Sequence, residues 1–459
     1  MGERQMKKKV MLSMFIALSF LFVAGGVVAV NESQEPDPID KMENRVLEIA
    51  VFEGGYGADY WQQVARAFEK DYPGTQIHIT SNPQISSIIK ARMVGGQVPD
   101  FIYLPTSGST NVPNWLIQER ALLDLTPIFE ENVPFEEIKI KDKLLEGILE
   151  QGQFMPYGDG KVYLAPLYYD VMGLFYNKQL LKENNWELPK TWDEFFELGE
   201  EAKKKGIALY TYPGMRPGFN DGVILPALAS LIGEEGLQAF FEYEEGVWKK
   251  DEVRKVFNLY RELGEGGYLL EGSLAFNNIQ AQKKFYEGNV LFIPSGNWIE
   301  REMYGIAEKS FEIGFMPVPS FKEHDQKYVS VRFQEMYIPK DAPNRDLAIE
   351  FLKYQYTDKA IALNQSCSQG MICVKDQLQS VKGNIPNSAY EAYAYALDER
   401  MGKVIESWKL VKNIPYHIRQ GLFNPIGEVI MGNISVDEWV EQVEGLSTKL
   451  RETILAYSN

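Results

Sequence analysis

The hydrophobic pattern near the amino terminus predicts three strands that alternate with two helices. Val46–Phe52, Gln76–Thr80 and Asp100–Leu104 are short apolar or β-branched runs near glycine or proline, which is typical of strands. Between the first two runs, apolar residues recur at the spacing of one helix face, at Trp61, Val64, Ala65 and Phe68. A second helix is predicted over 85–93. This alternation predicts a parallel sheet.

A second α/β region is predicted to begin near Asp170. Its strands are expected at Val171–Tyr176, Ile207–Tyr212 and Val290–Pro294. Thr191 and Glu194 have the spacing of a capping box, which predicts the start of a helix. Met316–Pro319 contains two prolines, so it is expected to be extended and to link two lobes. The pattern therefore favours an α/β fold with more than one lobe.

The amino terminus has the composition of an export signal. Arg4 and Lys7–Lys9 precede an uncharged run that ends in small residues, which predicts a signal peptide over 1–29. That run is also long enough to span a bilayer, so a retained anchor is the alternative. The polar segment 30–45 is predicted to be a spacer. No later segment is expected to cross a membrane.

The charge of the chain restricts its partners. The 459 residues carry a formal net charge of -17, and removal of 1–29 would leave about -20. Such a charge argues against nucleic acid and anionic membrane surfaces as partners. It suits an exported protein with an uncharged or cationic ligand.

Cysteine and histidine are scarce. Cys367 and Cys373 could form a small-loop disulfide outside the cytosol or remain two free thiols, and the sequence favours neither. His78, His324 and His417 are scattered, so no metal site is expected. No cofactor is predicted.

Recognisable catalytic and phosphate-binding motifs are absent from the sequence. The glycine-rich segment 53–57 lies between a strand and a helix, but it lacks a Walker lysine and the GxGxxG spacing. Its glycines favour close approach of an uncharged ligand, with a plain turn as the alternative. No GxSxG, HExxH or CxxC occurs. A pair of Asp or Glu residues that cleaves glycosides stays open as an alternative.

Aromatic and polar residues gather in the loops at predicted strand ends. Aromatic faces suit the C–H patches of sugar rings, and planar polar groups suit hydroxyls. The candidate ligand-binding residues are Glu53, Tyr56, Asn111, Tyr168, Asp170, Tyr212, Arg216, Asn220, Asp221, Asn297, Trp298, Arg332 and Glu335. Ordinary packing is the alternative for each of them taken alone.

Several segments match a known family when they are taken in this order. They are Val46–Phe68, Val98–Phe101, Leu174–Lys178, Thr191–Phe195, Phe285–Asn289, Pro294–Trp298, Met316–Pro319 and Ala348–Leu352. Together they resemble the extracellular solute-binding proteins, family 1, that serve carbohydrate ABC importers. Phe52–Gly57, Pro294–Glu300 and Met316–Ser320 further resemble the N-acetylglucosamine/diacetylchitobiose-binding branch.

The resemblance implies a two-lobed periplasmic-binding-protein-like fold (type II), in which each lobe is a mostly parallel sheet flanked by helices. Lobe 1 is then expected over 46–168 and 320–363, and lobe 2 over 169–319 and 364–459. A saccharide would bind in the cleft between the lobes, and hinge closure would present it to the membrane permease of an ABC importer. Trp298 would stack on a sugar ring, with Tyr56 and Tyr168 as further walls.

The expected role is therefore binding and delivery of a mono- or oligosaccharide, such as N-acetylglucosamine or chitobiose, by a monomer that is not an enzyme. An exported hydrolase and a sugar sensor are the alternatives. Family members often carry a lipid-anchored cysteine, and no cysteine lies near the end of the signal. The chain is thus expected either in the periplasm or at the outer face of the cytoplasmic membrane.

Overall fold

The computed structural model describes residue 39 and the ranges 42–106, 112–306, 311–411, 414 and 417–458. Met42–Asn459 forms one compact unit, and the fold below is that of this unit. The predicted signal peptide (1–29) and most of the predicted spacer (30–45) lie outside the described residues. The end of the spacer belongs to the folded unit, because the Asn344 side chain donates to the Asn44 carbonyl at 2.9 Å.

The strands of the described residues form one mixed sheet with the order β2-β1-β3-β8-β4-β6-β5, in which β7 also pairs with β4 and β9 with β8. The strands are β1 (Val46–Phe52), β2 (Gln76–Asn82), β3 (Phe101–Tyr103), β4 (Ala165–Asn177), β5 (Ala208–Tyr210), β6 (Val290–Gly296), β7 (Ile313–Met316), β8 (Tyr328–Tyr337) and β9 (Gly402–Ile405). The predicted parallel arrangement of the first three strands is confirmed, since β1 pairs in parallel with both β2 and β3.

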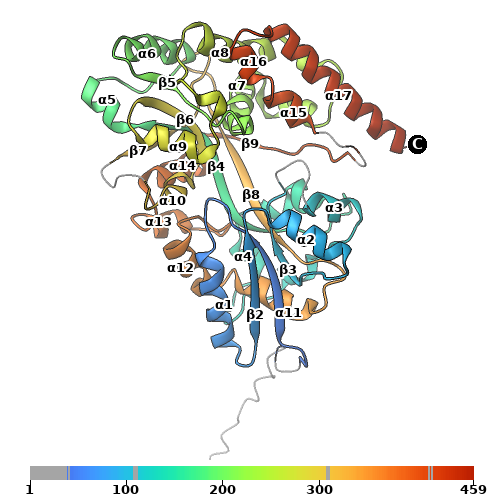
Figure 1. Ribbon diagram of the computed structural model, residues 1–459. Coiled ribbons are helices and arrows are strands. Elements are labelled where there is room, and N and C mark those ends of the chain that lie inside the picture. Colours follow the sequence, from blue (N-terminus) through green and yellow to red (C-terminus); the bar gives the residue numbers. More distant parts are fainter. Residues whose placement is uncertain are drawn as a thin grey trace, which may run out of the picture. The chain divides into compact units, whose positions relative to one another are not determined.

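Helices flank this sheet in two groups (Figure 1). Those of lobe 1 are α1 (Asp59–Asp71), α2 (Ile85–Val94), α3 (Val112–Gln118), α4 (Ile140–Lys143), α11 (Arg345–Tyr354) and α12 (Asp358–Cys367). Those of lobe 2 are α5 (Lys178–Asn184), α6 (Trp192–Lys204), α7 (Asp221–Phe241), α8 (Asp251–Glu265), α9 (Asn278–Tyr286), α10 (Ile299–Glu302), α14 (Asn387–Leu397), α15 (Ile418–Phe423), α16 (Ile426–Ile430) and α17 (Val436–Ser458). The short α13 (Gln377–Val381) lies between α12 and α14 along the chain.

β4 and β8 run through both lobes as an antiparallel pair, which Figure 1 shows side by side. One end of β8 pairs with β3 of lobe 1, and its other end pairs with β9 of lobe 2. The far end of β4 pairs with β6 and β7 of lobe 2. All residues of β4 are buried, which explains why it is apolar except at Asp170 and Asn177. The predicted lobe boundary after residue 168 lies inside this strand.

The segment Met316–Pro319 was expected to link the lobes, and that placement is wrong. It is extended, but it stays on lobe 2, because the Ser320 amide donates to the Lys190 carbonyl at 3.1 Å and the Trp192 amide donates to the Ser320 carbonyl at 3.0 Å. β8 makes the crossing to lobe 1 instead. The predicted capping box of α6 is present, with the Glu194 amide donating to Thr191 Oγ1 at 3.2 Å.

The core of lobe 2 is built on α7. Pro217–Phe241 is long and apolar enough to cross a membrane by length and hydropathy alone, contrary to the expectation from sequence. Half of its most apolar window is buried inside the fold, where α7 packs against β8, β9 and α8. Core packing therefore accounts for its composition.

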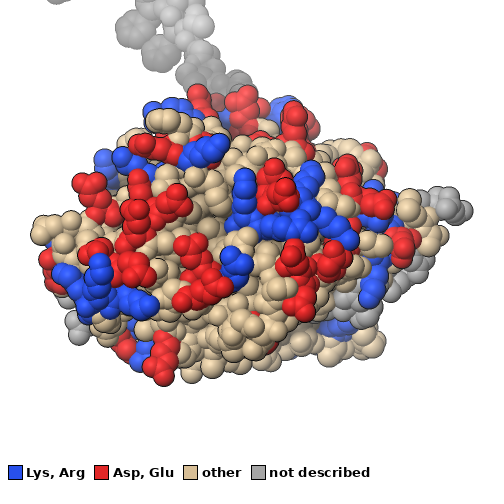
Figure 2. Space-filling model, turned by 90° about the horizontal axis from the view of Figure 1, so that it is seen from above, with Lys and Arg blue, Asp and Glu red and all other residues tan. Residues whose placement is uncertain are grey.

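The surface of lobe 2 carries charges of both signs. Figure 2 shows acidic and basic side chains interspersed over the face that is uppermost in Figure 1. Arg254 of α8 lies 2.8 Å from Asp437 of α17, and Lys249 lies 3.0 Å from Glu441. These exposed pairs connect α17 with α8 and with the turn before α8, and they contribute little to stability because water and salt screen them.

The packing of α8 on α16 predicts unequal effects of alanine at two helical glycines. A Cβ at Gly264 would overlap the carbonyl oxygen of Ile430, so Gly264→Ala should lower the free energy of unfolding by about 1–3 kcal/mol. Gly445 is exposed on α17, and Gly445→Ala should raise the free energy of unfolding by about 0.5–1 kcal/mol. Urea unfolding of both variants measures the difference, and equal effects would contradict this packing.

Candidate functional site

A cleft of about 680 Å³ lies between the two lobes. Lobe 1 contributes Thr106, α3 and the turns over 152–158, and lobe 2 contributes the end of α7, residues 406–411 and 414, and the start of α15. The floor is β8, through residues 331–333 and 335. This volume falls within the range of about 300–1,000 Å³ that is usual for small-molecule sites. Because both lobes line it, this cleft can respond to movement between them.

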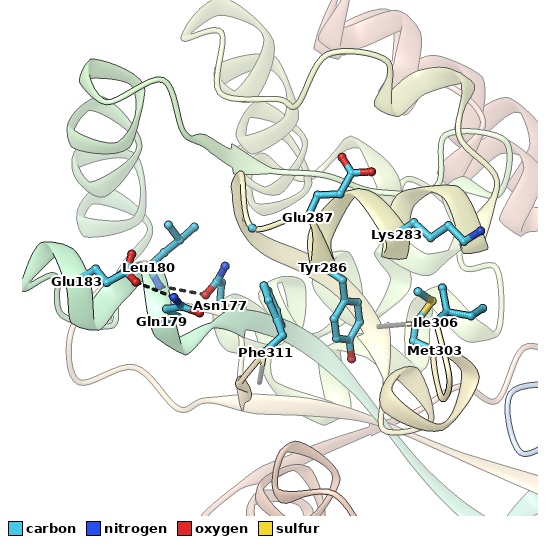
Figure 3. Close-up of a pocket in the computed structure, with 11 residues that line it drawn as sticks. Asn177, Gln179, Leu180, Glu183, Lys283, Tyr286, Glu287, Met303, Ile306 and Phe311 are labelled. Atoms are coloured by element: carbon cyan, nitrogen blue, oxygen red, sulfur yellow. Dashed lines mark hydrogen bonds between the residues drawn. The ribbon is translucent and has the colours of Figure 1, made fainter. Parts of the chain in front are cut away.

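A second hollow of about 690 Å³ lies within lobe 2 alone (Figure 3). It is lined by parts of α5 and α9 and by Met303, Ile306 and Phe311. Three of its polar side chains are engaged in contacts around α5, because the Leu180 amide donates to Asn177 Oδ1 at 3.0 Å and Gln179 Nε2 donates to Glu183 at 2.6 Å. Lobe 1 contributes nothing to its lining, so the interlobe cleft is the better candidate site.

A cluster of four charged residues forms part of the cleft floor. Arg332 of β8 is ion-paired with Asp221 at the start of α7 and lies 2.8 Å from Glu406. Arg419 of α15 also contacts both acids, at 2.8 Å from Asp221 and 2.6 Å from Glu406. Burial acts to raise the pKa of Glu406, but the two arginines lower it to about 2. Burial lowers the pKa of Arg332 to about 10. The two positive and two negative charges therefore compensate each other.

Glu335 is a fully buried carboxylate that also lines the cleft. It accepts hydrogen bonds from the Thr106 amide at 3.0 Å, from the Thr106 hydroxyl at 2.8 Å and from Gln153 Nε2 at 3.0 Å. Burial raises its pKa to about 7, against the opposing effect of Thr106. These contacts attach the loop after β3 and the turns over 152–158 to β8.

His417 supplies a neutral donor to the cleft. The Arg419 amide donates to His417 Nδ1 at 3.2 Å, which assigns the ring proton to Nε2. Burial and the charge of Arg419 lower the pKa of His417 to about 4, so the ring is neutral at pH 7. The Nε2–H can thus donate to an uncharged acceptor in the cleft.

A second buried network ties the glycine-rich loop to lobe 2. The Tyr56 hydroxyl donates to Asp170 at 2.5 Å and accepts from Asn297 Nδ2 at 2.7 Å. Asn297 also donates to the Tyr393 hydroxyl at 2.6 Å, and the Tyr56 ring stacks on Tyr168 at 4.4 Å between centroids. Burial raises the pKa of Asp170 to about 6. The network joins the loop after β1 to β4 and to residues of lobe 2. Its residues are not among those that line the cleft.

The predicted site residues thus fall into several groups. Arg332 and Glu335 line the cleft, and Asp221 pairs with Arg332. The buried network holds Tyr56, Tyr168, Asp170 and Asn297, and Trp298 packs beside it against the backbones of Gly55 and Gly296. Tyr212 and Asn220 are buried in lobe 2, Glu53 and Arg216 are exposed, and Asn111 lies outside the described residues. A role in ligand binding stays a prediction for each of them.

Several residues that line the cleft were missed from the sequence. They include Thr106, Gln153, Trp408, His417 and Arg419. Trp408 lies in an irregular segment after β9, which lacks helical or strand periodicity. An aromatic residue in a proline-containing loop was the available signal, but the loops weighed from sequence were mostly those at the ends of predicted strands.

Thiol and metal chemistry have little support in the described residues. Cys367 and Cys373 are both free thiols, the first half-buried and the second buried. Across the described ranges, no group of three His, Cys, Asp or Glu side chains is placed to hold a metal ion.

Comparison with known proteins gives consistent matches. A family model described as a bacterial extracellular solute-binding protein matches residues 54–362. The chain is 26% identical over 430 residues to the diacetylchitobiose binding protein NgcE of Streptomyces coelicolor, which covers 92% of this chain and 88% of that protein. It is 24% identical over 335 residues to a multiple sugar-binding protein of Streptococcus mutans, which covers 68% and 72%, respectively.

Solved structures show the same fold. A chitin oligosaccharide binding protein superposes with a TM-score of 0.70 and 20% identity, covering 88% of this chain and 99% of that one. The SBP RafE in complex with raffinose gives a TM-score of 0.68 and 16% identity, covering 89% and 100%. The two-lobed α/β fold predicted from the sequence is therefore confirmed.

The burial of Glu335 predicts a pH-dependent stability. Its pKa is raised from 4.5 to about 7, so its contribution is full below about pH 4.5 and is lost as the pH rises through about 7. The stability of the wild type relative to Glu335→Gln should therefore increase by about 1–3 kcal/mol between about pH 7.5 and pH 5. Urea unfolding at several pH values measures this difference.

The wild type must be compared with Glu335→Gln because His417 changes the stability of the fold with pH in the opposite direction to Glu335. Its lowered pKa removes stability as the pH falls below about 6.5, and this effect is common to both proteins and cancels. Glu53→Gln, at an exposed carboxylate, is the matched control. A difference between wild type and Glu335→Gln that does not change with pH would contradict the assignment.

Proposed function

Because the chain belongs to the bacterial extracellular solute-binding protein family, we propose that it binds an uncharged saccharide between its lobes and delivers it to an ABC importer. The observation that carries this proposal is the chemistry of the interlobe cleft. The four charges of the buried cluster compensate each other, and the lining also holds neutral side-chain donors and acceptors such as Gln153 and His417.

The compensated charges favour a neutral ligand. Arg332 and Arg419 are paired with Asp221 and Glu406, so none of the four is left to balance a ligand charge. An anion or a cation that paired with one of these four groups would disrupt the cluster, which leaves buried charges unpaired and is strongly unfavourable. A ligand that only hydrogen-bonds leaves it intact.

Planar polar groups and apolar surface meet in the same cleft. Side-chain amides line it at Asn114, Gln118, Gln153 and Gln238. Amides both donate and accept, as sugar hydroxyls do. Apolar side chains such as Ile117 and Val411 lie among them and suit the C–H faces of a ring. This combination supports a carbohydrate rather than an amino acid, whose charged ends need unpaired counter-charges.

The saccharide we propose is of the N-acetylglucosamine type, such as chitobiose. The relative NgcE is a diacetylchitobiose binding protein, and it covers most of the chain. An acetamido group adds one donor, one acceptor and a methyl group, which the mixed lining of the cleft can accommodate. The number of sugar units in the ligand is determined by the binding experiment below.

Delivery would use movement between the lobes. β4, β8 and the segment after α12 connect them, so closure can be absorbed by a few backbone positions. A ligand that contacts Gln153 of lobe 1 and His417 of lobe 2 stabilises the closed state by its differential contacts. The closed form would then dock on a permease. The family is extracellular, so the chain is exported, and we propose the periplasm or the outer face of the cytoplasmic membrane as its location.

A glycosidase role is less well supported. Glu335 has the raised pKa of a general acid, but Thr106 and Gln153 occupy its oxygens. Glu406 is held by two arginines. Neither carboxylate is poised to act on a glycosidic oxygen or on water.

Isothermal titration with a panel of N-acetylglucosamine, N,N′-diacetylchitobiose, maltotriose and raffinose tests the proposal. At least one saccharide should bind, and at about 100 times its Kd it should add about 2.7 kcal/mol to the free energy of unfolding. Gln153→Ala should weaken binding about 10-fold, or about 1.4 kcal/mol, while the exposed Gln63→Ala on α1 should not.

Two results would contradict the proposal. One is a protein that binds amino acids or peptides and none of the saccharides. The other is release of monosaccharide from N,N′-diacetylchitobiose or maltotriose, as detected by chromatography. Such release would make the protein a hydrolase.

A further inference from the structure

Trp408 is an aromatic side chain that lines the cleft on a segment outside any helix or strand. It is half-buried, and one side of it packs on the lobe 2 core. Its ring is nearly parallel to those of Tyr243 and Trp248, with centroids at 6.0 and 6.3 Å and interplanar angles of 18° and 17°. Phe241 meets it edge-on at 4.7 Å. The plane of the indole is therefore set by three aromatic neighbours.

The polar edge of the same indole is also fixed. Trp408 Nε1 donates to Glu406 Oε2 at 2.6 Å. The backbone beside it is held by the Tyr243 hydroxyl, which donates to the Lys409 carbonyl at 3.1 Å, and by the Lys409 amide, which donates to the Phe241 carbonyl at 2.9 Å. An irregular segment thus presents a rigid aromatic surface to the cleft.

Glu406 connects this surface to β8. The carboxylate that accepts from Trp408 also pairs with Arg332 of β8 and with Arg419 of α15. Arg332 lies on the strand that both lobes share, so the orientation of Trp408 is linked to the connection between the lobes. Movement of β8 on ligand capture would act on Trp408 through one carboxylate.

Trp298, which the sequence favoured as the stacking residue, has a different environment. A Cβ at either Gly55 or Gly296 would overlap its indole, so backbone from lobe 1 and lobe 2 lies directly against the ring. It is not among the residues that line the cleft. Of the two tryptophans, Trp408 is the one placed to meet a ligand.

We infer that Trp408 is the specificity-determining wall on which a pyranose ring of the ligand stacks, and that Glu406 is the residue that positions it. The inference rests on the proposed function, because it assumes a saccharide in the cleft. The ring would present its C–H face to the indole while its hydroxyls reach the amides and His417.

The test measures binding of the same four saccharides to variants of the full chain. The wild type will bind one of the saccharides most tightly. Trp408→Ala should weaken binding of that saccharide by roughly 10-fold or more. Trp408→Phe keeps a ring but lacks the N–H, so its loss should be smaller. Trp186→Ala is the matched control, since that half-buried tryptophan packs on the same core away from the cleft. Urea unfolding checks that each variant is folded.

A double-mutant cycle tests the positioning role. Glu406→Gln should weaken binding more in the wild-type background than in the Trp408→Phe background, because the N–H that it positions is absent from the latter. Ligand addition should change tryptophan fluorescence less in Glu406→Gln and in Trp408→Phe than in the wild type. A residue with a merely structural role would give additive losses and an unchanged fluorescence response.

The outcomes separate the two proposals. If the wild type binds none of the saccharides, the proposed function fails. If the wild type binds but Trp408→Ala binds as tightly as Trp186→Ala, Trp408 is not the stacking wall and the inference is wrong. If Glu406→Gln does not fold, the comparison of Trp408→Ala, Trp408→Phe and Trp186→Ala still decides the role of Trp408.

Discussion

The pairing of β4 with β8 is the constraint on which the rest of the structure depends. The two strands stay in register from Ala165 opposite Met336 to Met172 opposite Ser330, with one irregularity near Pro166. The sheet of lobe 1 attaches at one end of this pair, and the strands of lobe 2 attach at the other. Since backbone hydrogen bonds fix the register, relative motion of the lobes is limited to twisting and bending of the pair. The floor of the cleft is one of these strands, so ligand contacts and lobe movement involve the same backbone.

Polar groups on the same strand pair bring the distant parts of the site together. Asp170, Arg332 and Glu335 are largely removed from water, and burial of a charge is unfavourable unless it is paired and hydrogen-bonded. Each finds partners on a separate segment: Tyr56 for Asp170, Asp221 and Glu406 for Arg332, and Thr106 for Glu335. The need for these partners fixes where the loops of both lobes lie relative to β8. The partners of these charged residues on β4 and β8 therefore determine which loops lie beside the cleft.

The sequence predicted those features whose signals are local. The first three strands, α1 and the capped start of α6 follow from apolar spacing and from Thr191 and Glu194, and the structure contains them. The length of β4 was underestimated, because its early residues are apolar on both faces and lack an alternating pattern. Contacts such as those of Arg332 with Asp221 and Glu406 join residues far apart in sequence, and no single-sequence pattern encodes them. Trp408 was missed for the same reason, since the role that we infer for it depends on Tyr243, Trp248 and Glu406 as neighbours.

The contrast between the acidic chain and its compensated cleft explains how such a site can select a ligand. With a formal net charge of -17, the protein would repel anions at a distance. Inside the cleft, Arg332 and Arg419 cancel Asp221 and Glu406, while His417 is neutral at pH 7. Selection among neutral ligands then depends on shape and on hydrogen-bond geometry, because a buried amide or imidazole left unpaired by a poor ligand is unfavourable by about 1–3 kcal/mol. The pairing that balances these four charges also holds Glu406 ionised and fixed in place. The contacts that, as we propose, make the cleft selective for neutral rings therefore also hold that carboxylate between two arginines.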